Sequence, residues 1–180
     1  MKIVDVKSTC LAIPFKESIT WGLGSQKKAC PILVQVFTDE GIVGLGETIG
    51  PSASVEKTIV DHELRPRIIG QDPMRLERIL HIMEGVTTYW YDCASYAIAA
   101  VDVALFDIVG KALNTPVHNL LGGLYAEKVP FSGYIFIDTP ERNSEMALKY
   151  VEQGFREIKM KVGRNPEQDV QRVKAVRESV

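Results

Sequence analysis

The chain has 180 residues, of which 46% are apolar and 24% charged, the balance of a globular protein with room for one or two domains. Its net charge of −2 gives no electrostatic reason to expect nucleic acid or an anionic membrane as a partner. No apolar run approaches the ~18–20 residues of a membrane span, and Asp5 and Lys7 interrupt any signal-like start. Cys10, Cys30 and Cys93 are too widely spaced for a CxxC metal site, so we expect buried thiols and a cytoplasmic protein.

Three strand-like segments open the chain. The first is β-rich and ends at Pro14, and the other two flank a short Asp/Gly turn at residues 39–41, which is a hairpin signal. Residues 16–29 lie between the first two strands, and their glycines and polar residues predict a mobile loop. The predicted strands cover residues 3–13, 32–37 and 42–46.

Three helices are predicted next, which makes the pattern α+β. Ser52 or the next serine caps the first helix, which places Val55 on its apolar side, and Asp72 caps the second ahead of a proline. The third helix, from about residue 93 to 113, is apolar on most faces and is therefore expected to be buried. Within it, Asp107 and Lys111 have the i,i+4 spacing of a structural ion pair.

From Lys128 onward the pattern changes to alternating strands and helices. This βαβα series is typical of a parallel sheet, and a lone pair of parallel strands cannot cover both of its faces. We therefore divide the chain into a domain of residues 1–125 and an unfinished region of residues 126–180. The predicted strands cover residues 129–137 and 155–162, the helices cover 140–153 and 166–180, and the apolar stripe of the last helix is Val170, Val173 and Val176.

Charged and apolar residues alternate along the strand at residues 157–162. Side chains alternate between the two faces of a strand, so the apolar residues here share one face, and Lys159 and Lys161 share the other. If the apolar face packs under helices, both lysines point into the interior of a sheet or barrel. Two ammonium groups roughly 7 Å apart at their backbones disfavour each other's protonation, which favours a base near neutral pH. Lys161 is nearest the C-terminal end of the strand, where β/α barrels keep their chemistry.

The same two lysines have a plainer interpretation. Lysine is common on solvated edge strands, where it deters aggregation, and a K-x-K pattern is weakly specific. From the residues alone, this edge-strand alternative is as well supported as a catalytic pair.

Several segments in order resemble one known family. They are the hairpin at residues 34–47, the helix 100–107 with its continuation to 117, the turn 120–123, the strand start at 129–131 and the K-x-K-V-G segment at 159–163. Together they resemble the mandelate racemase and muconate lactonizing enzyme family of the enolase superfamily. The resemblance implies a capping domain at residues 1–125 and the first two βα units of an incomplete (β/α)7β barrel at 126–180.

The resemblance also implies a chemistry. In this family a divalent metal, usually Mg²⁺, holds a small carboxylate substrate while a base removes its α-proton and an enediolate forms. Carried over to this chain, Lys161 is the base and Lys159 is the neighbour that helps to neutralise the carboxylate. We expect the metal ligands beyond Val180, so that these 180 residues alone are inactive, and we expect a homo-oligomer. The specificity loops implied by the family contain Trp21, Gly22, Ile49, Gly50 and Ser52.

The substrate stays open at this point. The small polar loop at residues 50–52 favours an acid-sugar dehydratase or a hydroxy-acid racemase. The alternative within the family is muconate lactonizing, dipeptide epimerase or succinylbenzoate synthase chemistry. A stand-alone binding or assembly module without catalysis is the alternative from another class, and exposed apolar surface beside the last βα unit would argue against it.

Overall fold

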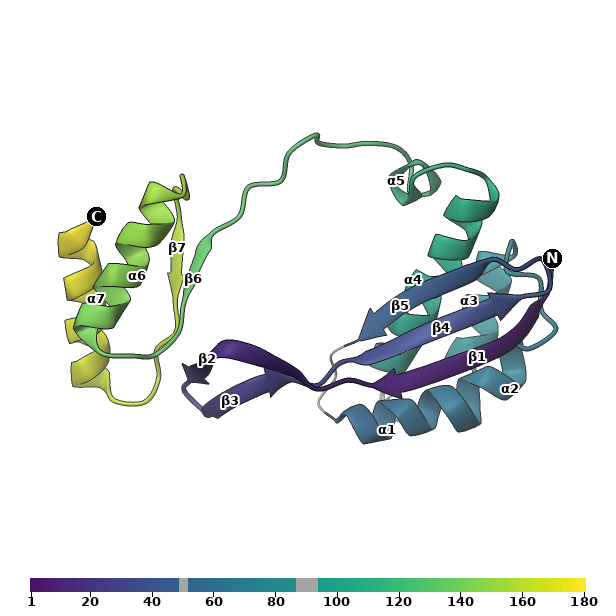
Figure 1. Cartoon of the computed structure of the whole chain (residues 1–180), viewed down its shortest axis with the longest axis horizontal. Helices are drawn as coiled ribbons and strands as arrows, with labels where there is room; N and C mark the ends of the chain where they lie inside the picture. Colours follow the sequence, from purple (N-terminus) through teal and green to yellow (C-terminus); the bar gives the residue numbers. More distant parts are fainter. Residues whose placement is uncertain (49–51, 87–93) are drawn as a thin grey trace. The chain divides into compact units, whose positions relative to one another are not determined.

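The computed structural model describes residues 1–48, 52–86 and 94–180 (Figure 1). The chain divides into two compact units. The first contains residues 1–13 and 29–125, and the second contains residues 14–28 and 126–180. Each unit has its own cluster of buried apolar side chains.

A three-stranded antiparallel sheet forms one layer of the first unit. Its order is β1 (Ile3–Cys10), β4 (Ile32–Thr38) and β5 (Val43–Thr48), which confirms the predicted hairpin. Burial alternates strictly along β4, as expected of a strand with one face on a core. Pro14 does not end the first strand as predicted, because β1 ends at Cys10 and Pro14 lies inside the next strand.

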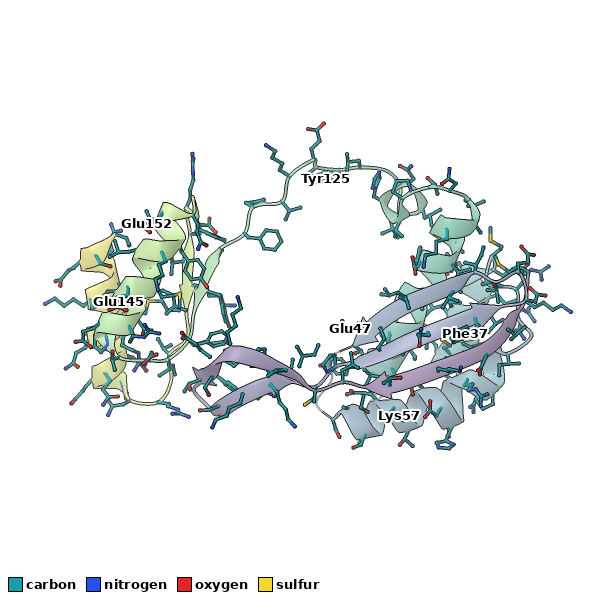
Figure 2. The ribbon with its side chains drawn as sticks, viewed as in Figure 1. Phe37, Glu47, Lys57, Tyr125, Glu145 and Glu152 are labelled. Atoms are coloured by element: carbon teal, nitrogen blue, oxygen red, sulfur yellow. The ribbon has the colours of Figure 1, made fainter. Side chains whose placement is uncertain are left out.

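Helices cover one face of this sheet, so the predicted α+β architecture is confirmed (Figure 1). Lys57 on the first helix donates to the carbonyl oxygen of Ser8 on β1 at 2.9 Å and to Asp61 at 2.6 Å, which fixes that helix along the sheet edge (Figure 2). The helices are α1 (Ala53–Thr58), the π-helical turn η1 (Ile59–Leu64), α2 (Arg65–Ile68), α3 (Leu76–Glu84), α4 (Ser95–Ala112) and α5 (Val117–Leu120).

Three local predictions in the first unit are wrong. Val55 is exposed, whereas Leu64, which belongs to the same predicted apolar stripe, is buried together with Val60 in the π-helical turn that follows α1. Asp72 does not cap the second helix but forms a turn with Arg75, so α3 begins four residues later. Cys10 is exposed at the end of β1 and Cys30 is half-buried, and Cys93 lies outside the described residues.

The closest packing in the first unit is between β5 and α4. A Cβ atom added at Gly44 would overlap the carbonyl oxygen of Ala104, and one at Gly46 would overlap that of Ala100. Both glycines are therefore required by the approach of the helix backbone rather than by a turn. Asp107, one turn beyond, accepts a hydrogen bond from the main-chain N–H of Leu45 at 2.8 Å.

The predicted pair of Asp107 and Lys111 is confirmed and does more than bridge one helix. Lys111 lies 2.6 Å from Asp107 and also donates to the carbonyl oxygen of Val43 at 2.7 Å. The two side chains thus bond β5 on both sides of Gly44, and they fix the helix in register with the strand.

A β-hairpin takes the place of the loop predicted at residues 16–29. It consists of β2 (Ile13–Trp21) and β3 (Gly24–Ala29), joined by a two-residue turn at Gly22 and Leu23. The hydroxyls of Thr20 and Ser25 lie 3.1 Å apart across the two strands. The glycines that suggested mobility therefore form a tight turn, the usual connection between two antiparallel strands.

Two βα units form the rest of the second unit, as the alternating pattern predicted. They are β6 (Gly133–Ile135), α6 (Pro140–Glu152), β7 (Ile158–Met160) and α7 (Pro166–Ser179), and the two strands are parallel. Both strands are much shorter than predicted, because they pair only over three residues each. The core is Ile135, Ala147 and Val176 beneath the helices. Val170 and Val173 are 67% and 46% exposed, so only one member of the predicted α7 stripe is buried.

Replacing Gly46 with Ala should lower the free energy of unfolding by about 3 kcal/mol, because the new methyl group has no space against the α4 backbone. Urea unfolding of the chain measures the change. Leu45→Ala is the matched control on the same strand, since its side chain is 46% exposed, and it should cost less than about 1 kcal/mol. Equal losses for the two variants would contradict the close-approach account.

Candidate functional site

The two lysines of the K-x-K segment lie on the same face of the small parallel sheet. Strand β7 pairs with β6 so that Tyr134 is opposite Lys159, and the pairs on either side are Gly133–Ile158 and Ile135–Met160. Ile158 and Met160 pack against the core beneath the helices. Lys159 and Lys161 point to the other face, where their Nζ atoms lie 5.3 and 5.7 Å from the ring centroid of Tyr134.

The strand that carries these lysines ends in a tightly bonded turn. Lys161 is half-buried. Its main-chain N–H donates to the carbonyl oxygen of Ile135 at 2.8 Å, which extends the pairing of β6 with β7 by one residue. Gly163 follows with a φ of +112°, and its N–H donates to Asp169 at 2.8 Å. Asn165 caps α7 by accepting from the N–H of Gln168 at 3.1 Å.

The β2–β3 hairpin meets this turn within the second unit. A Cβ atom added at Gly22 would lie 3.2 Å from the carbonyl oxygen of Gly163 and 3.3 Å from that of Val162. The N–H of Ile137, just after β6, donates to the carbonyl oxygen of Thr20 at 2.8 Å. The turn of the hairpin is therefore held against the strand end that follows Lys161.

An ion pair joins the same hairpin to α6. Arg142 lies 3.2 Å from Glu17 on β2 and 3.2 Å from Glu145 on its own helix. The carboxylates of Glu17 and then Glu145 raise the pKa of Arg142, so this guanidinium stays charged. All three side chains are substantially exposed, so the pair orients the hairpin more than it stabilises it.

The predicted specificity residues fall into three groups. Gly22 and Trp21 belong to the hairpin turn beside the lysine strand, with the Trp21 ring 3.5 Å from a Cβ built at Gly24. Ser52 lies in the first unit, at the start of α1, with its hydroxyl 3.1 Å from that of Ser54. Ile49 and Gly50 lie outside the described residues.

Tyr134 and Asp169 are site residues that the sequence analysis missed. Tyr134 carries the ring beneath both lysines, and Asp169 bonds the glycine that ends their strand. Strand alternation around Gly133 would have placed Tyr134 on the lysine face, but only the register of β6 against β7 shows that it is opposite Lys159.

The described residues offer no complete site for a metal ion. No group of three or more His, Cys, Asp or Glu side chains among residues 1–48, 52–86 and 94–180 is arranged to hold one. The residues present therefore do not by themselves fit the Mg²⁺ that the resemblance implies. Within the same ranges, no helix has the length and apolar character needed to cross a bilayer.

The family model of the mandelate racemase and muconate lactonizing enzyme N-terminal domain matches residues 2–122. The chain belongs to this family. A second model, for the enolase C-terminal domain-like region, matches residues 143–180. The chain therefore contains the N-terminal domain of the family, followed by part of its C-terminal region.

Relatives of this family member include racemases, epimerases and dehydratases. The chain is 39% identical to the N-succinyl-L-Arg/Lys racemase of Bacillus cereus, over 100% of this chain and 49% of the relative. The solved structure of that racemase superimposes with a TM-score of 0.93 at 36% identity, again over 100% of this chain and 49% of the other. A dipeptide epimerase from Enterococcus faecalis, solved in complex with Mg and the dipeptide L-Leu-L-Tyr, has a TM-score of 0.87 at 34% identity and covers 100% and 51%. The chain thus spans about half the length of the curated relatives it matches.

Replacing Gly163 with Ala should cost about 1–3 kcal/mol of unfolding free energy, because a φ of +112° is strained for any residue with a Cβ atom. Urea unfolding measures this loss. Gly24→Ala in the neighbouring hairpin is the control, since its new methyl group would make only an ordinary 3.5 Å contact with Trp21. Equal losses of unfolding free energy for the two variants would contradict the strained backbone conformation of Gly163 in the turn after Lys161.

Proposed function

We propose that this chain supplies the base of an enzyme that removes the proton α to the carboxylate of a small substrate. The observation that carries the proposal is the position of Lys159 and Lys161 on one face of β7, next to the strand end and the hairpin turn. In the step, the α C–H bond breaks, the proton moves to the lone pair of the Lys161 Nζ, and the electron pair delocalises into the carboxylate as an enediolate. The ammonium group of Lys159 then offsets part of the new negative charge.

The surroundings of the lysines support an anionic substrate. Both amines project from the face opposite the packed helices, so a carboxylate can approach both at once. The hairpin turn at Gly22 borders the end of the same strand, which is where a specificity loop has access to the substrate. Because the family resemblance implies Mg²⁺, we include this ion in the proposal, and we expect its ligands outside the described residues.

We propose an N-acylated amino acid or a dipeptide as the substrate, with racemisation or epimerisation at its α-carbon. The support is that the N-succinyl-L-Arg/Lys racemase and the hydrophobic dipeptide epimerase, at 39% and 36% identity, match over 100% of this chain. An acid-sugar or hydroxy acid is the second candidate. It is favoured by the D-galactonate dehydratase of Verminephrobacter eiseniae, which is 36% identical over 72% of this chain and 34% of the relative.

The exposed surface of α7 favours an enzyme barrel over a stand-alone module. Val162, Val170 and Val173 are 48%, 67% and 46% exposed and line an open apolar cleft of about 790 Å³ beside the β7 turn. A parallel sheet of two strands with such an apolar flank needs further βα units to cover it. We propose that additional units of the barrel pack there. The cytoplasmic location and the homo-oligomer stay predictions.

Lys161→Ala should strongly slow proton exchange in the polypeptide that joins this chain to the rest of the proposed barrel. Loss of a positioned general base lowers the rate by roughly 10²–10⁴-fold. The measurement is deuterium incorporation at the α-carbon of N-succinyl-L-arginine in D₂O. Lys174→Ala on α7 is the control, because this exposed lysine pairs only loosely with Glu178, at 3.8 Å, and it should exchange normally. Undiminished exchange by the Lys161→Ala variant would rule out the proposed base.

A substrate panel separates the two candidate classes. The same polypeptide, supplied with Mg²⁺, should exchange or epimerise N-succinyl amino acids or dipeptides and leave aldonic acids such as D-galactonate unchanged. Dehydration of aldonic acids without exchange of any acylated amino acid would establish the second candidate in place of the first.

A further inference from the structure

We infer that Tyr134 is a positioning residue for the lysine pair, a role that the family resemblance does not assign. Its ring lies beneath both ammonium groups, with Nζ-to-centroid distances of 5.3 Å for Lys159 and 5.7 Å for Lys161. Both distances lie within the ~6 Å at which a cation is attracted to the face of an aromatic ring. One aromatic ring therefore contacts two cations, which lie two residues apart along the neighbouring strand.

The ring is held in place from several sides. Tyr134 is directly opposite Lys159 in the parallel register, so its side chain points to the lysine face. Phe136 packs edge-on against it, with ring centroids 4.8 Å apart and an interplanar angle of 81°. The hydroxyl of Tyr150 donates to the main-chain carbonyl of Tyr134 at 3.1 Å, which fixes β6 beneath the ring.

The physical effect is to hold the two ammonium groups of the resting site together, and Lys161 acts as the base from this position after it has released its own proton. Two neighbouring ammonium groups repel each other, and flexible lysine side chains would otherwise swing apart into solvent. The negative face of a single ring attracts both, so it keeps both amines above one spot on the sheet. Since proton removal requires the base within hydrogen-bond reach of the substrate, a fixed Nζ favours the reactive geometry.

The hydroxyl of Tyr134 is not needed for this role. Within residues 1–48, 52–86 and 94–180, Tyr134 enters hydrogen bonding through its main-chain carbonyl, and no side-chain hydrogen bond of its hydroxyl is present. The role therefore belongs to the ring, and phenylalanine should replace it. A hydroxyl that binds substrate would behave in the opposite way.

The first test uses this chain alone and does not depend on activity. In ¹H–¹³C NMR spectra, the CεH₂ signals of Lys159 and Lys161 should be shifted upfield by the ring, relative to the exposed Lys174. Tyr134→Leu and Tyr134→Met should remove the shift, and Tyr134→Phe should keep it. Phe155→Leu is the matched control, because it removes a ring that packs on Tyr150 at 5.2 Å in the same unit. Unshifted lysine signals in the wild type, or signals that survive in both ringless variants, would overturn the inference.

The second test rests on the proposed function and uses the polypeptide with the rest of the barrel. Tyr134→Leu or Tyr134→Met should lower kcat for α-proton exchange about 5- to 10-fold with KM changed less than about 2-fold, since two modest cation–π contacts are lost. Tyr134→Phe should restore kcat. An equal loss in the Phe variant would instead assign the hydroxyl to substrate binding and would contradict the inference. Absence of exchange in the wild type with every substrate would reject the proposed function, while the NMR result would still decide the role of Tyr134.

Discussion

The first unit depends on the contact between the backbone of α4 and strand β5. Gly44 and Gly46 leave no side chain between them, so the carbonyl groups of Ala100 and Ala104 lie directly on the strand. Two polar side chains one turn further then bond the main chain of β5 from the helix. Strand β5 holds one face of α4 at this short distance. The other faces of α4 pack against α3 and against the helical segment formed by α1 and η1, and one continuous core results.

The second unit is built on a much smaller core, and main-chain hydrogen bonds and turns do more of the positioning. Two short strands and two helices bury three residues, Ile135, Ala147 and Val176. Because side chains alternate along β7, its apolar residues pack against that core, and the lysine pair lies on the other face. Gly22 and Gly163 then let the hairpin turn and the strand end approach without a side chain between them. The same few residues thus set both the fold and the direction of the charged groups.

Periodicity predicted much of this architecture, and local turn chemistry accounts for most of the errors. The strands of the first sheet and the βαβα order follow from apolar alternation, which burial of one face enforces. The hairpin at β2–β3 was missed because its glycines and polar residues suggested a loop, although Phe15, Ile19 and Trp21 lie on one face of β2. Val55 was misplaced because α1 buries its neighbour Glu56 instead, and the helical period then changes in the π-helical turn that follows, which no residue type in the segment marks. Val170 was misplaced because α7 packs mainly against α6, which leaves Val170 67% exposed.

The lysine pair shows where sequence reasoning reaches its limit. Lys159 and Lys161 on one face of a strand fit a solvated edge as well as a catalytic pair, and their own spacing does not separate the two. The neighbouring strand adds the missing constraint, because an aromatic ring placed opposite Lys159 attracts both amines and keeps them together. Lys159 is exposed and Lys161 is half-buried, so their exposure alone also fits an edge strand whose lysines deter aggregation. Under the proposed function, two amines gathered over Tyr134 can act on one anionic group, and this arrangement is what supports the catalytic alternative.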